Sequence, residues 1–490
     1  MADRILKDLQ PEKVFRYFEE ICGIPHGSHN IRQISDYLTG WAEERGLSCT
    51  QEPCGNVIVR VPATPGYEQA QTVILQGHMD MVAVKDADCG LDMERDGLEL
   101  LAEGDYISAK GTSLGGDDGI ALAYGLAIAD SDDIPHPPLE LLFTVNEETG
   151  MDGARELDVR HLQGRTLINI DSEEEGTLLV GCAGGARVDI SGETEKAPAE
   201  GSRYRITLSG MQGGHSGAEI HKNRENAIAV LARALDRLAE QVPYVLAKLS
   251  GGSKDNVIPS EACADIFCTA SPKKALEEVF AELYAELSVR EPDMKLRCEE
   301  AAAVGDGTAA EPLRESGEGL SAASRDRLLS LLQLLPFGVV RMSAAMPGVV
   351  ETSANIGTAL AAERVQITCS VRSMIASARD QLCRQIALLA GALGYEVRVH
   401  GAYPGWQYRQ ESPLRETMVR VYEDMYGTKP AVEAIHAGLE CGLFLEKLPE
   451  LDCVSIGPDI LDIHSTRERL SVSSTQRVWS YLLRVLAELR

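Results

Sequence analysis

The chain lacks the excess of positive charge that a nucleic-acid or anionic-membrane partner requires. Its 490 residues carry 75 Asp and Glu against 47 Lys and Arg, so the formal net charge is −28 and the pI is near 4.8. A surface of this sign repels phosphates, which excludes both classes of partner from the prediction. With 44% hydrophobic and 25% charged residues, the composition is that of an ordinary globular protein. Most of the acids are expected on solvated surface, but acids gathered in a cleft would need cations.

The sequence also lacks long apolar segments. No uninterrupted apolar run approaches the ~20 residues that a membrane helix requires. The first eight residues, Met-Ala-Asp-Arg-Ile-Leu-Lys-Asp, contain no apolar signal core. We therefore expect a cytoplasmic protein.

Cysteine pairs with the spacing of a zinc site are absent. Twelve cysteines are scattered along the chain without any C-x-x-C pair. The closest pairs, Cys49/Cys54 and Cys263/Cys268, have no second pair to complete a tetrahedral site. This pattern predicts free, mostly buried thiols in a reducing compartment.

Three apolar segments instead run directly into histidines or carboxylates. They are the segment before Gln76-Gly77-His78-Met79-Asp80, Leu139–Val145 before Asn146-Glu147-Glu148, and Thr166–Ile170 before Asp171. Each is short and apolar, as expected of a buried strand. The glycine-rich turn at 110–116 feeds a helical segment that begins at Asp117-Asp118.

Strands that alternate with helices predict an α/β fold with a mainly parallel, helix-covered sheet. In such sheets ligands bind outside the carboxyl ends of the strands. The side chains of His78, Asp80, Glu147, Glu148 and Asp171 are therefore expected to meet at one edge. His78 alone could be a satisfied structural histidine, but several such strand ends together favour a site.

The length of the chain favours more than one domain. We predict a catalytic domain whose first segment is 1–187 and whose second segment is 401–490. An inserted α/β lid domain would occupy 188–400. Within it, a strand and a helix near 203–241 recur near 365–399, which suggests two related units. Residues 301–321, rich in Ala, Gly and Glu, are expected to form a loop.

The expected site contains enough carboxylates and histidines for two divalent ions that share a bridging carboxylate. Two cations would also explain how so many acids can converge without repulsion. Glu147 and Glu148 are adjacent and therefore point in different directions. One can bind metal while the other faces water, which is the division that metal-assisted hydrolysis requires.

Six short motifs, in order along the chain, resemble those of the aminoacylase/carboxypeptidase clan of di-zinc hydrolases. They are G-H-M-D at 77–80, G-G-D-D-G-I-A at 115–121, N-E-E-T-G at 146–150, N-I-D-S-E at 169–173, G-G-H-S-G at 213–217, and G-P-D with H-S-T-R-E at 457–468. Each motif is weak alone, whereas six in sequence are specific. Within the clan the chain resembles the bacterial non-specific dipeptidases, to which residues 435–442 are particularly similar.

The resemblance implies that Asp117 bridges two zinc ions. His78 and Asp171 would complete the protein ligands of one ion, and Glu148 and His464 those of the other. Oxygen and nitrogen sites of this kind also accept cobalt or manganese.

The resemblance also implies two further roles beside the metals. Asp80 would hold the ring of His78. Glu147 would take a proton from water during attack on the peptide carbonyl and pass it to the leaving amine. A cis peptide bond is implied between Asp117 and Asp118.

In the lid domain, the resemblance implies that His215 approaches the substrate carbonyl or carboxylate. Asn256 and Arg372 would contact the substrate's C-terminal carboxylate or the oxyanion. From the residues alone, Asn256 could instead be a turn asparagine and Arg372 a surface arginine. His436 and Glu440 are pocket candidates without an assigned role. The other six histidines are expected to be structural or at the surface: His26, His29, His136, His161, His221 and His400.

The resemblance, together with these residues, implies a di-zinc dipeptidase of broad specificity that accepts Xaa-His, acts on small peptides and forms a homodimer. Whether His215 acts within its own chain or across the dimer stays open. The alternatives are another hydrolase of the clan, namely an N-acyl amino acid deacylase or a carboxypeptidase, and a non-catalytic binding protein. A nucleotide protein is disfavoured because the glycine-rich turn lacks G-x-G-x-x-G and the lysine-containing phosphate loop.

Overall fold

The structure is a computed structural model that describes residues 4–300 and 315–490, and it divides into two compact units. Unit 1 consists of Met1–Cys182, Trp406–Ala434 and Leu439–Arg490, and unit 2 of Ala183–Gly405 and Ile435–Gly438. The boundaries after Cys182 and before Trp406 lie a few residues from those predicted at 187 and 401. The first boundary coincides with the end of strand β8 (Thr177–Cys182) rather than with a change in composition. The brief return of residues 435–438 to unit 2 has no signal in the sequence.

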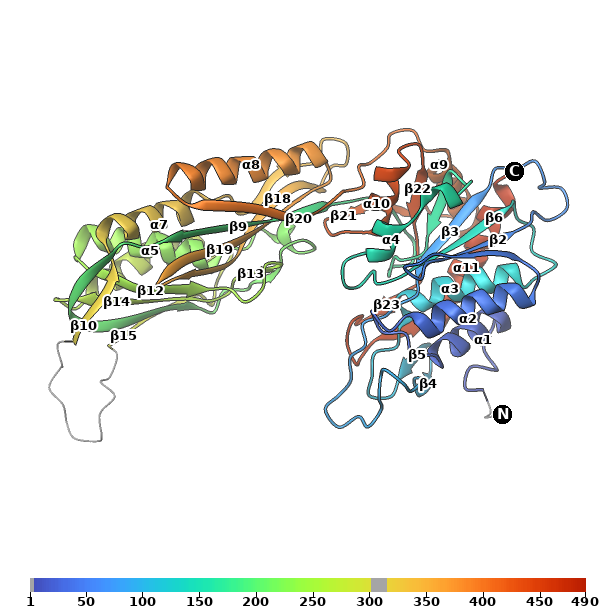
Figure 1. Cartoon of the computed structure of the whole chain (residues 1–490), viewed down its shortest axis with the longest axis horizontal. Helices are drawn as coiled ribbons and strands as arrows, with labels where there is room; N and C mark the ends of the chain where they lie inside the picture. Colours follow the sequence, from blue (N-terminus) through green and yellow to red (C-terminus); the bar gives the residue numbers. More distant parts are fainter. Residues whose placement is uncertain (1–3, 301–314) are drawn as a thin grey trace. The chain divides into compact units, whose positions relative to one another are not determined.

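Unit 1 is built on an eight-stranded sheet in the order β1-β2-β6-β3-β7-β22-β8-β21 (Figure 1). Its strands are β1 (Ser48–Gln51), β2 (Val57–Val61), β3 (Val73–His78), β6 (Leu139–Thr144), β7 (Thr166–Asn169), β8 (Thr177–Cys182), β21 (Ala431–Ile435) and β22 (Asp452–Ser455). The pairs β3–β6, β3–β7 and β7–β22 are parallel. The pairs β1–β2, β2–β6 and β8–β22 are antiparallel. The predicted α/β class is confirmed, with parallel pairing at the centre of the sheet and a hairpin extending one edge.

Helices cover this sheet and bury its central strands. They are α1 (Glu12–Cys22), α2 (Arg32–Glu44), α3 (Gly116–Ala129), α4 (Asp152–Glu156), α9 (Pro413–Tyr426), α10 (Glu440–Lys447) and α11 (Val472–Glu488). Helix α1 packs on α3, which in turn packs on β3 (Figure 1). Every residue of β3 and β6 is buried, which is why these strands appear in the sequence as nearly continuous apolar runs.

A second, four-stranded sheet of unit 1 has the order β23-β24-β5-β4. Its strands are β4 (Leu100–Glu103), β5 (Tyr106–Ala109), β23 (Ile460–Leu461) and β24 (Arg469–Ser471). The antiparallel pair β23–β24 closes the loop that carries His464.

Unit 2 contains a ten-stranded sheet with the order β15-β10-β14-β12-β18-β19-β9-β20, in which β16 pairs with β10 and β17 with β18. The strands are β9 (Gly184–Glu193), β10 (Lys196–Ser209), β12 (Val245–Gly251), β14 (Ala262–Cys268), β15 (Lys295–Glu300), β16 (Glu315–Leu320), β17 (Gly338–Met342), β18 (Val350–Ala361), β19 (Arg364–Ser373) and β20 (Glu396–Tyr403). The pairs of its described strands are antiparallel.

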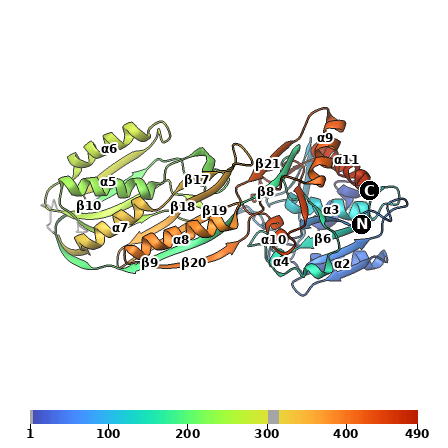
Figure 2. The same ribbon diagram turned by 90° about the horizontal axis from the view of Figure 1, so that it is seen from above.

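Four helices lie across this sheet (Figure 2): α5 (Ala227–Gln241), α6 (Lys273–Leu287), α7 (Ala322–Leu334) and α8 (Ala376–Ala392). Together with the inward side chains of the strands they form one apolar core. A separate two-stranded pair joins β11 (Gly214–His215) to β13 (Val257–Ile258).

Three sequence expectations can be checked directly. The twelve cysteines are free, as predicted. Of the loop predicted at 301–321, residues 301–314 lie outside the described residues. Residues 315–320 form strand β16 instead of a loop, because pairing with β10 outweighs their glycine-rich composition. Within the described ranges, no helix combines the length and the apolar character that spanning a bilayer demands.

Candidate metal centre and active site

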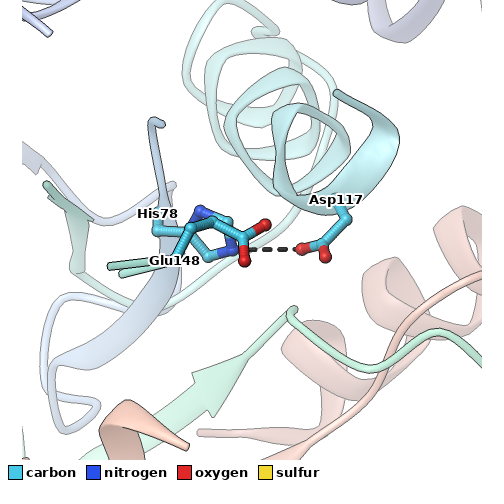
Figure 3. Close-up of side chains that lie close together, drawn as sticks. All are labelled: His78, Asp117 and Glu148. Atoms are coloured by element: carbon cyan, nitrogen blue, oxygen red, sulfur yellow. Dashed lines mark hydrogen bonds and ion pairs between the residues drawn. The ribbon is translucent and has the colours of Figure 1, made fainter. Parts of the chain in front are cut away.

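The predicted metal ligands of unit 1 meet at the carboxyl ends of its parallel strands. His78 ends β3, whereas Glu148 and Asp171 follow β6 and β7, and Asp117 lies in the first turn of α3. Figure 3 shows His78, Asp117 and Glu148 directed toward one another. The Nε2 atom of His78 is 3.0 Å from Oδ1 of Asp117 and 3.3 Å from Oδ1 of Asp171.

His464 completes the group from the loop between β23 and β24. Its Nε2 atom is 3.3 Å from Oδ2 of Asp117 and 2.9 Å from Oε2 of Glu148. The two oxygens of Asp117 therefore face two different histidines. This is the position that a carboxylate shared by two ions would occupy, and all five predicted ligands lie together.

The donor set fits divalent cations. Ligand atoms of His78, Asp117 and Glu148 lie within 4.8 Å of one another, and so do those of His78, Asp118 and Asp171. Within the described ranges, the ion pairs of these carboxylates involve histidines and no lysine or arginine. Oε1 of Glu148 is buried without a hydrogen-bond partner. A buried acceptor of this kind is satisfied by a cation.

The charges in the cluster favour a cation at its centre. Burial alone would lower the pKa of His78, but the carboxylates of Asp171 and Asp117 raise that pKa well above its ordinary value. The pKa of His464 rises to about 10 because its ring N–H donates to Asp117 and Glu148. The two histidines hold the pKa of Asp117 below its usual range despite burial. The protons on these histidines are what a divalent ion would replace.

Asp80 contacts both the ring of His78 and the backbone beyond the strand end. Its carbonyl accepts the Nδ1–H of His78 at 2.9 Å, whereas its carboxylate lies 3.7 Å from Nδ1. The carboxylate instead accepts the backbone N–H of Glu147 at 3.0 Å and the hydroxyl of Ser28 at 2.8 Å. Asp80 thus contacts the ring nitrogen Nδ1 through its carbonyl, with its carboxylate within ion-pair range, and the predicted role of the carboxylate in orienting the ring stays a prediction. Nε2 of His78 remains the nitrogen that faces the other carboxylates.

Glu147 is partly buried beside the predicted ligands. Burial raises the pKa of Glu147 well above its ordinary value, and the neighbouring carboxylates of Asp171, Glu440 and Glu148 add to this, whereas His78 opposes it. A carboxylate whose pKa is raised is better suited to act as a general base than an ordinary one.

Sequence reasoning missed how Glu468 holds the turn before Asp117. Its carboxylate accepts the backbone N–H groups of Leu114 at 2.9 Å, Gly115 at 3.2 Å and Gly116 at 2.8 Å. Gly115 adopts a φ of +68°, which glycine tolerates best. Glu468 is part of the quoted H-S-T-R-E motif, but its partners lie far away in the sequence.

The peptide bond between Asp117 and Asp118 is cis, as the resemblance implied. Oδ2 of Asp118 accepts the backbone N–H of His78 at 3.2 Å. Asp118, which the sequence argument left without a role, thus links α3 to the end of β3.

Unit 2 brings its own predicted residues together. His215 on β11 lies opposite Val257 on β13, and the carbonyl of the preceding Asn256 accepts the N–H of Ser216 at 2.9 Å. A Cβ atom on Gly217 would lie 3.0 Å from Cε1 of His215, 3.2 Å from Cζ of Arg372 and 2.5 Å from the carbonyl oxygen of His436. The turn therefore approaches Arg372 and His436 so closely that glycine is required at 217.

Hydrogen bonds define the polar atoms of this second cluster. Nδ1 of His215 accepts the backbone N–H of Ala218 at 2.9 Å, so the ring proton lies on Nε2. Burial and the nearby Arg372 lower the pKa of His215, which keeps the ring neutral. Arg372 is partly buried, donates from Nη1 to the hydroxyl of Tyr403 at 3.0 Å, and leaves Nε buried without a partner.

His436, which had no predicted role, is buried in the same cluster. Its Nε2 lies 2.8 Å from the hydroxyl of Ser353, and Nδ1 has no partner. Burial, with a contribution from the charge of Arg372, lowers the pKa of His436 to about 4. Tyr403 and Ser353 were not anticipated, since only strand pairing brings them beside residues so distant in sequence.

The sequence and the fold of this chain are similar to those of known peptidases. A family model described as peptidase family M20/M25/M40 matches residues 74–488. The chain is 38% identical to the cytosol non-specific dipeptidase of Escherichia coli strain K12, over 99% of each protein. It superposes on the aminoacylhistidine dipeptidase from Vibrio alginolyticus with a TM-score of 0.90 and 37% identity, covering 99% of this chain and 98% of that one. The aminopeptidase PepT from Bacillus cereus shares the fold at a TM-score of 0.56 and 17% identity, covering 98% and 99%. These matches confirm the resemblance that the motifs indicated.

Proposed function

The chain belongs to peptidase family M20/M25/M40, and from that premise we propose that it is a metal-dependent dipeptidase of broad specificity, with Xaa-His dipeptides among its substrates. The observation that carries the proposal is the meeting of five metal-ligand candidates beside Glu147 at the strand ends. The names of the E. coli and V. alginolyticus relatives support the substrate class.

His78, Asp117 and Asp171 would hold one divalent ion, and Asp117, Glu148 and His464 the other. Zinc is the proposed metal, with cobalt or manganese as alternatives. When bound, the ions supply Lewis acidity that polarises a carbonyl group and lowers the pKa of water.

Glu147 is proposed as the general base and acid. Its carboxylate takes a proton from water as the water oxygen adds to the peptide carbonyl carbon. It then gives that proton to the amine nitrogen as the C–N bond breaks, which releases two amino acids. The hydrogen bond from its backbone N–H to Asp80 positions it.

In unit 2 we propose that Arg372, His215 and Asn256 bind the C-terminal carboxylate of the substrate or the developing oxyanion. The unpartnered Nε of Arg372 gives its guanidinium spare donor capacity for a carboxylate. The Nε2–H of the neutral His215 is a further donor. Recognition of a free carboxylate is what a dipeptide, rather than an internal segment of a protein, would need.

We also propose a cytoplasmic homodimer, on the name of the E. coli relative for the location and on the family resemblance for the assembly. Mixing His215→Ala and Glu147→Gln chains tests how His215 acts. If activity returns on mixing, His215 acts on substrate bound at the active site of the other subunit. If a mixed dimer stays inactive, His215 acts at the active site of its own chain.

The decisive experiment is a substrate panel with metal analysis. The zinc-loaded protein is assayed on Xaa-His and ordinary dipeptides, an N-acetyl amino acid and longer peptides. Hydrolysis of the dipeptides with two ions per chain supports the proposal. Turnover of the N-acetyl amino acid alone would indicate a deacylase, release of C-terminal residues from longer peptides alone a carboxypeptidase, and no turnover a binding protein.

A further inference from the structure

A fully buried carboxylate lies beneath the predicted site of unit 1. Glu440 is the first residue of α10 and is 0% exposed. Its Oε2 accepts hydrogen bonds from Nε2 of Gln76 at 2.6 Å and from the hydroxyl of Thr144 at 2.7 Å. Its Oε1 is buried without a partner. The carboxylate makes no hydrogen bond to a predicted ligand, so its hydrogen bonds reach the site through Gln76 and Thr144.

The hydrogen bonds continue from Gln76 to a third strand. Oε1 of Gln76 accepts from Nδ2 of Asn169 at 2.6 Å. Gln76, Thr144 and Asn169 belong to β3, β6 and β7. One carboxylate is therefore linked, directly or through a single amide, to the three adjacent central strands.

These linked side chains stand where the backbone pairing ends. The β3–β7 ladder stops at Gln76 opposite Asn169, and the β3–β6 ladder stops at His78 opposite Thr144. Beyond these pairs the chains leave the sheet and lead to Glu147 and Asp171. Backbone hydrogen bonds continue just past these pairs, from the N–H of Met79 to the carbonyl of Thr144 at 2.8 Å and from the N–H of Ile170 to the carbonyl of Gln76 at 2.9 Å. The side-chain bonds at the last pairs add to them in orienting the strand ends.

We propose that Glu440 is a positioning residue of the proposed dipeptidase: through this chain of hydrogen bonds it fixes the three strand ends that present the site. The expected change in kcat rests on the proposed function. The expected change in zinc affinity rests on the geometry alone.

The required property of Glu440 is an acceptor oxygen at the place of Oε2. Burial raises the pKa of Glu440 to about 7, although His78 and the hydrogen bond from Thr144 act to lower it. A neutral side chain of the same shape is therefore compatible with the site. Glutamine keeps the acceptor oxygen, whereas alanine removes the shorter bond of each donor. The Gln76 amide would keep only Oγ1 of Thr144 at 3.2 Å, and the Thr144 hydroxyl only the carbonyl of Gly77 at 3.4 Å.

The test compares Glu440→Gln, Glu440→Ala and Glu440→Asp with Glu140→Ala as a matched control. Glu140 is also buried in β6, at the other end of the strand, where its carboxylate accepts the N–H groups of Gln163 and Gly164. For each variant kcat, KM, the melting temperature and the zinc affinity of the metal-free protein are measured.

We expect Glu440→Ala to lower kcat and zinc affinity about tenfold each, with KM nearly unchanged. Glu440→Gln should stay within about threefold of wild type on both measures. Glu140→Ala should lower the melting temperature but leave both measures unchanged. If Glu440→Ala does not fold, Glu440→Asp decides, because its shorter side chain cannot reach both donors and should lose kcat and zinc affinity.

Equal effects of Glu440→Ala and Glu140→Ala on kcat and zinc affinity would reduce Glu440 to a structural role. Loss of both properties in Glu440→Gln would also overturn the inference. A wild-type protein that hydrolyses no dipeptide refutes the proposed function instead, and the zinc affinities still decide the role of Glu440.

Discussion

The buried acids of the two units have different partners. In unit 2, Asp265 is 3% exposed, and Arg203 and Arg205 each lie 2.8 Å from its carboxylate. In the described part of unit 1, the carboxylates of Asp117 and Glu148 pair with histidines only. Arginine is charged at every accessible pH, whereas a histidine gives up its proton to a competing cation. The strand-end acids Asp117 and Glu148 of unit 1 thus lack the permanent cations that neutralise Asp265 in unit 2, and a divalent ion could take the place of the histidine protons beside them.

The direction of the strands explains why the metal-ligand candidates found among the described residues gather in unit 1. Parallel strands present all their carboxyl ends at one edge, so ligands from β3, β6 and β7 converge there. The antiparallel strands of unit 2 alternate in direction, and its polar cluster is assembled instead around the close approach of Gly217 to Arg372. The converging strand ends of the first sheet are therefore suited to a metal centre, and the polar cluster of the second unit is suited to substrate recognition.

The largest effect is expected from Glu147→Gln. Loss of the proposed base should lower kcat about a thousandfold. Metal content should not change, because the assigned ligands remain. Kinetics and elemental analysis of the same preparation check this, with the exposed Glu174→Gln as control. Substantial remaining activity, or loss of metal, would contradict the assignment.

Glu148→Gln tests whether the acids of unit 1 that pair with histidines bind metal, in contrast to Asp265 of unit 2, which pairs with arginines. We expect it to lose one of two ions and about a hundredfold in kcat, since a ligand oxygen is removed. Asp265→Asn in unit 2 should leave metal content unchanged. The comparison between the units fails if both variants retain the full metal content.

Arg372→Ala tests the proposed role of unit 2. We expect KM for dipeptides to rise about tenfold to a hundredfold, because the variant loses a charge-assisted hydrogen bond to the substrate. The metal content should not change. Arg205→Ala, which removes an arginine that is 57% exposed and paired with Asp265, should leave KM unchanged. A KM unaffected by Arg372→Ala would remove Arg372 from substrate binding.

The smallest effect concerns the pH dependence of the metal-free protein. The folded pKa of His464 is about 10 against an ordinary value of 6.5, so its contribution to stability is complete below pH 6.5 and is lost as the pH rises toward 10. Asp117 has a lowered pKa, so its contribution is present above about pH 3.8 and lost below it. The melting temperature should therefore fall by a few degrees between pH 6.5 and 10.

Melting curves of His464→Ala provide the control for this pH dependence. The variant should show a weaker alkaline fall, and zinc should flatten the curve of the wild type because the ion replaces the proton. An identical slope in the variant would show that His464 does not carry the effect.

Much of the site could be predicted from sequence because local pattern and motif coincide. The apolar runs before His78, Glu147 and Asp171 are strands in the structure, with ends within a residue or two of those expected. Parallel packing then places their ends at one edge. The further partners of the Asp80 carboxylate, Ser28 and the Glu147 backbone, could not be predicted, because tertiary contacts set them.

The amino-acid sequence by itself determined the α/β class, the strand ends and the identity of the metal-ligand candidates, since hydrophobic periodicity and residue chemistry are local properties. Only the tertiary structure decided that Glu468 holds the glycine-rich turn, that Glu440 links three strands and that His436 joins Arg372. These residues act on partners far away in the chain. No local pattern records such pairs, because they exist only when packing excludes water and requires each buried polar group to find a partner.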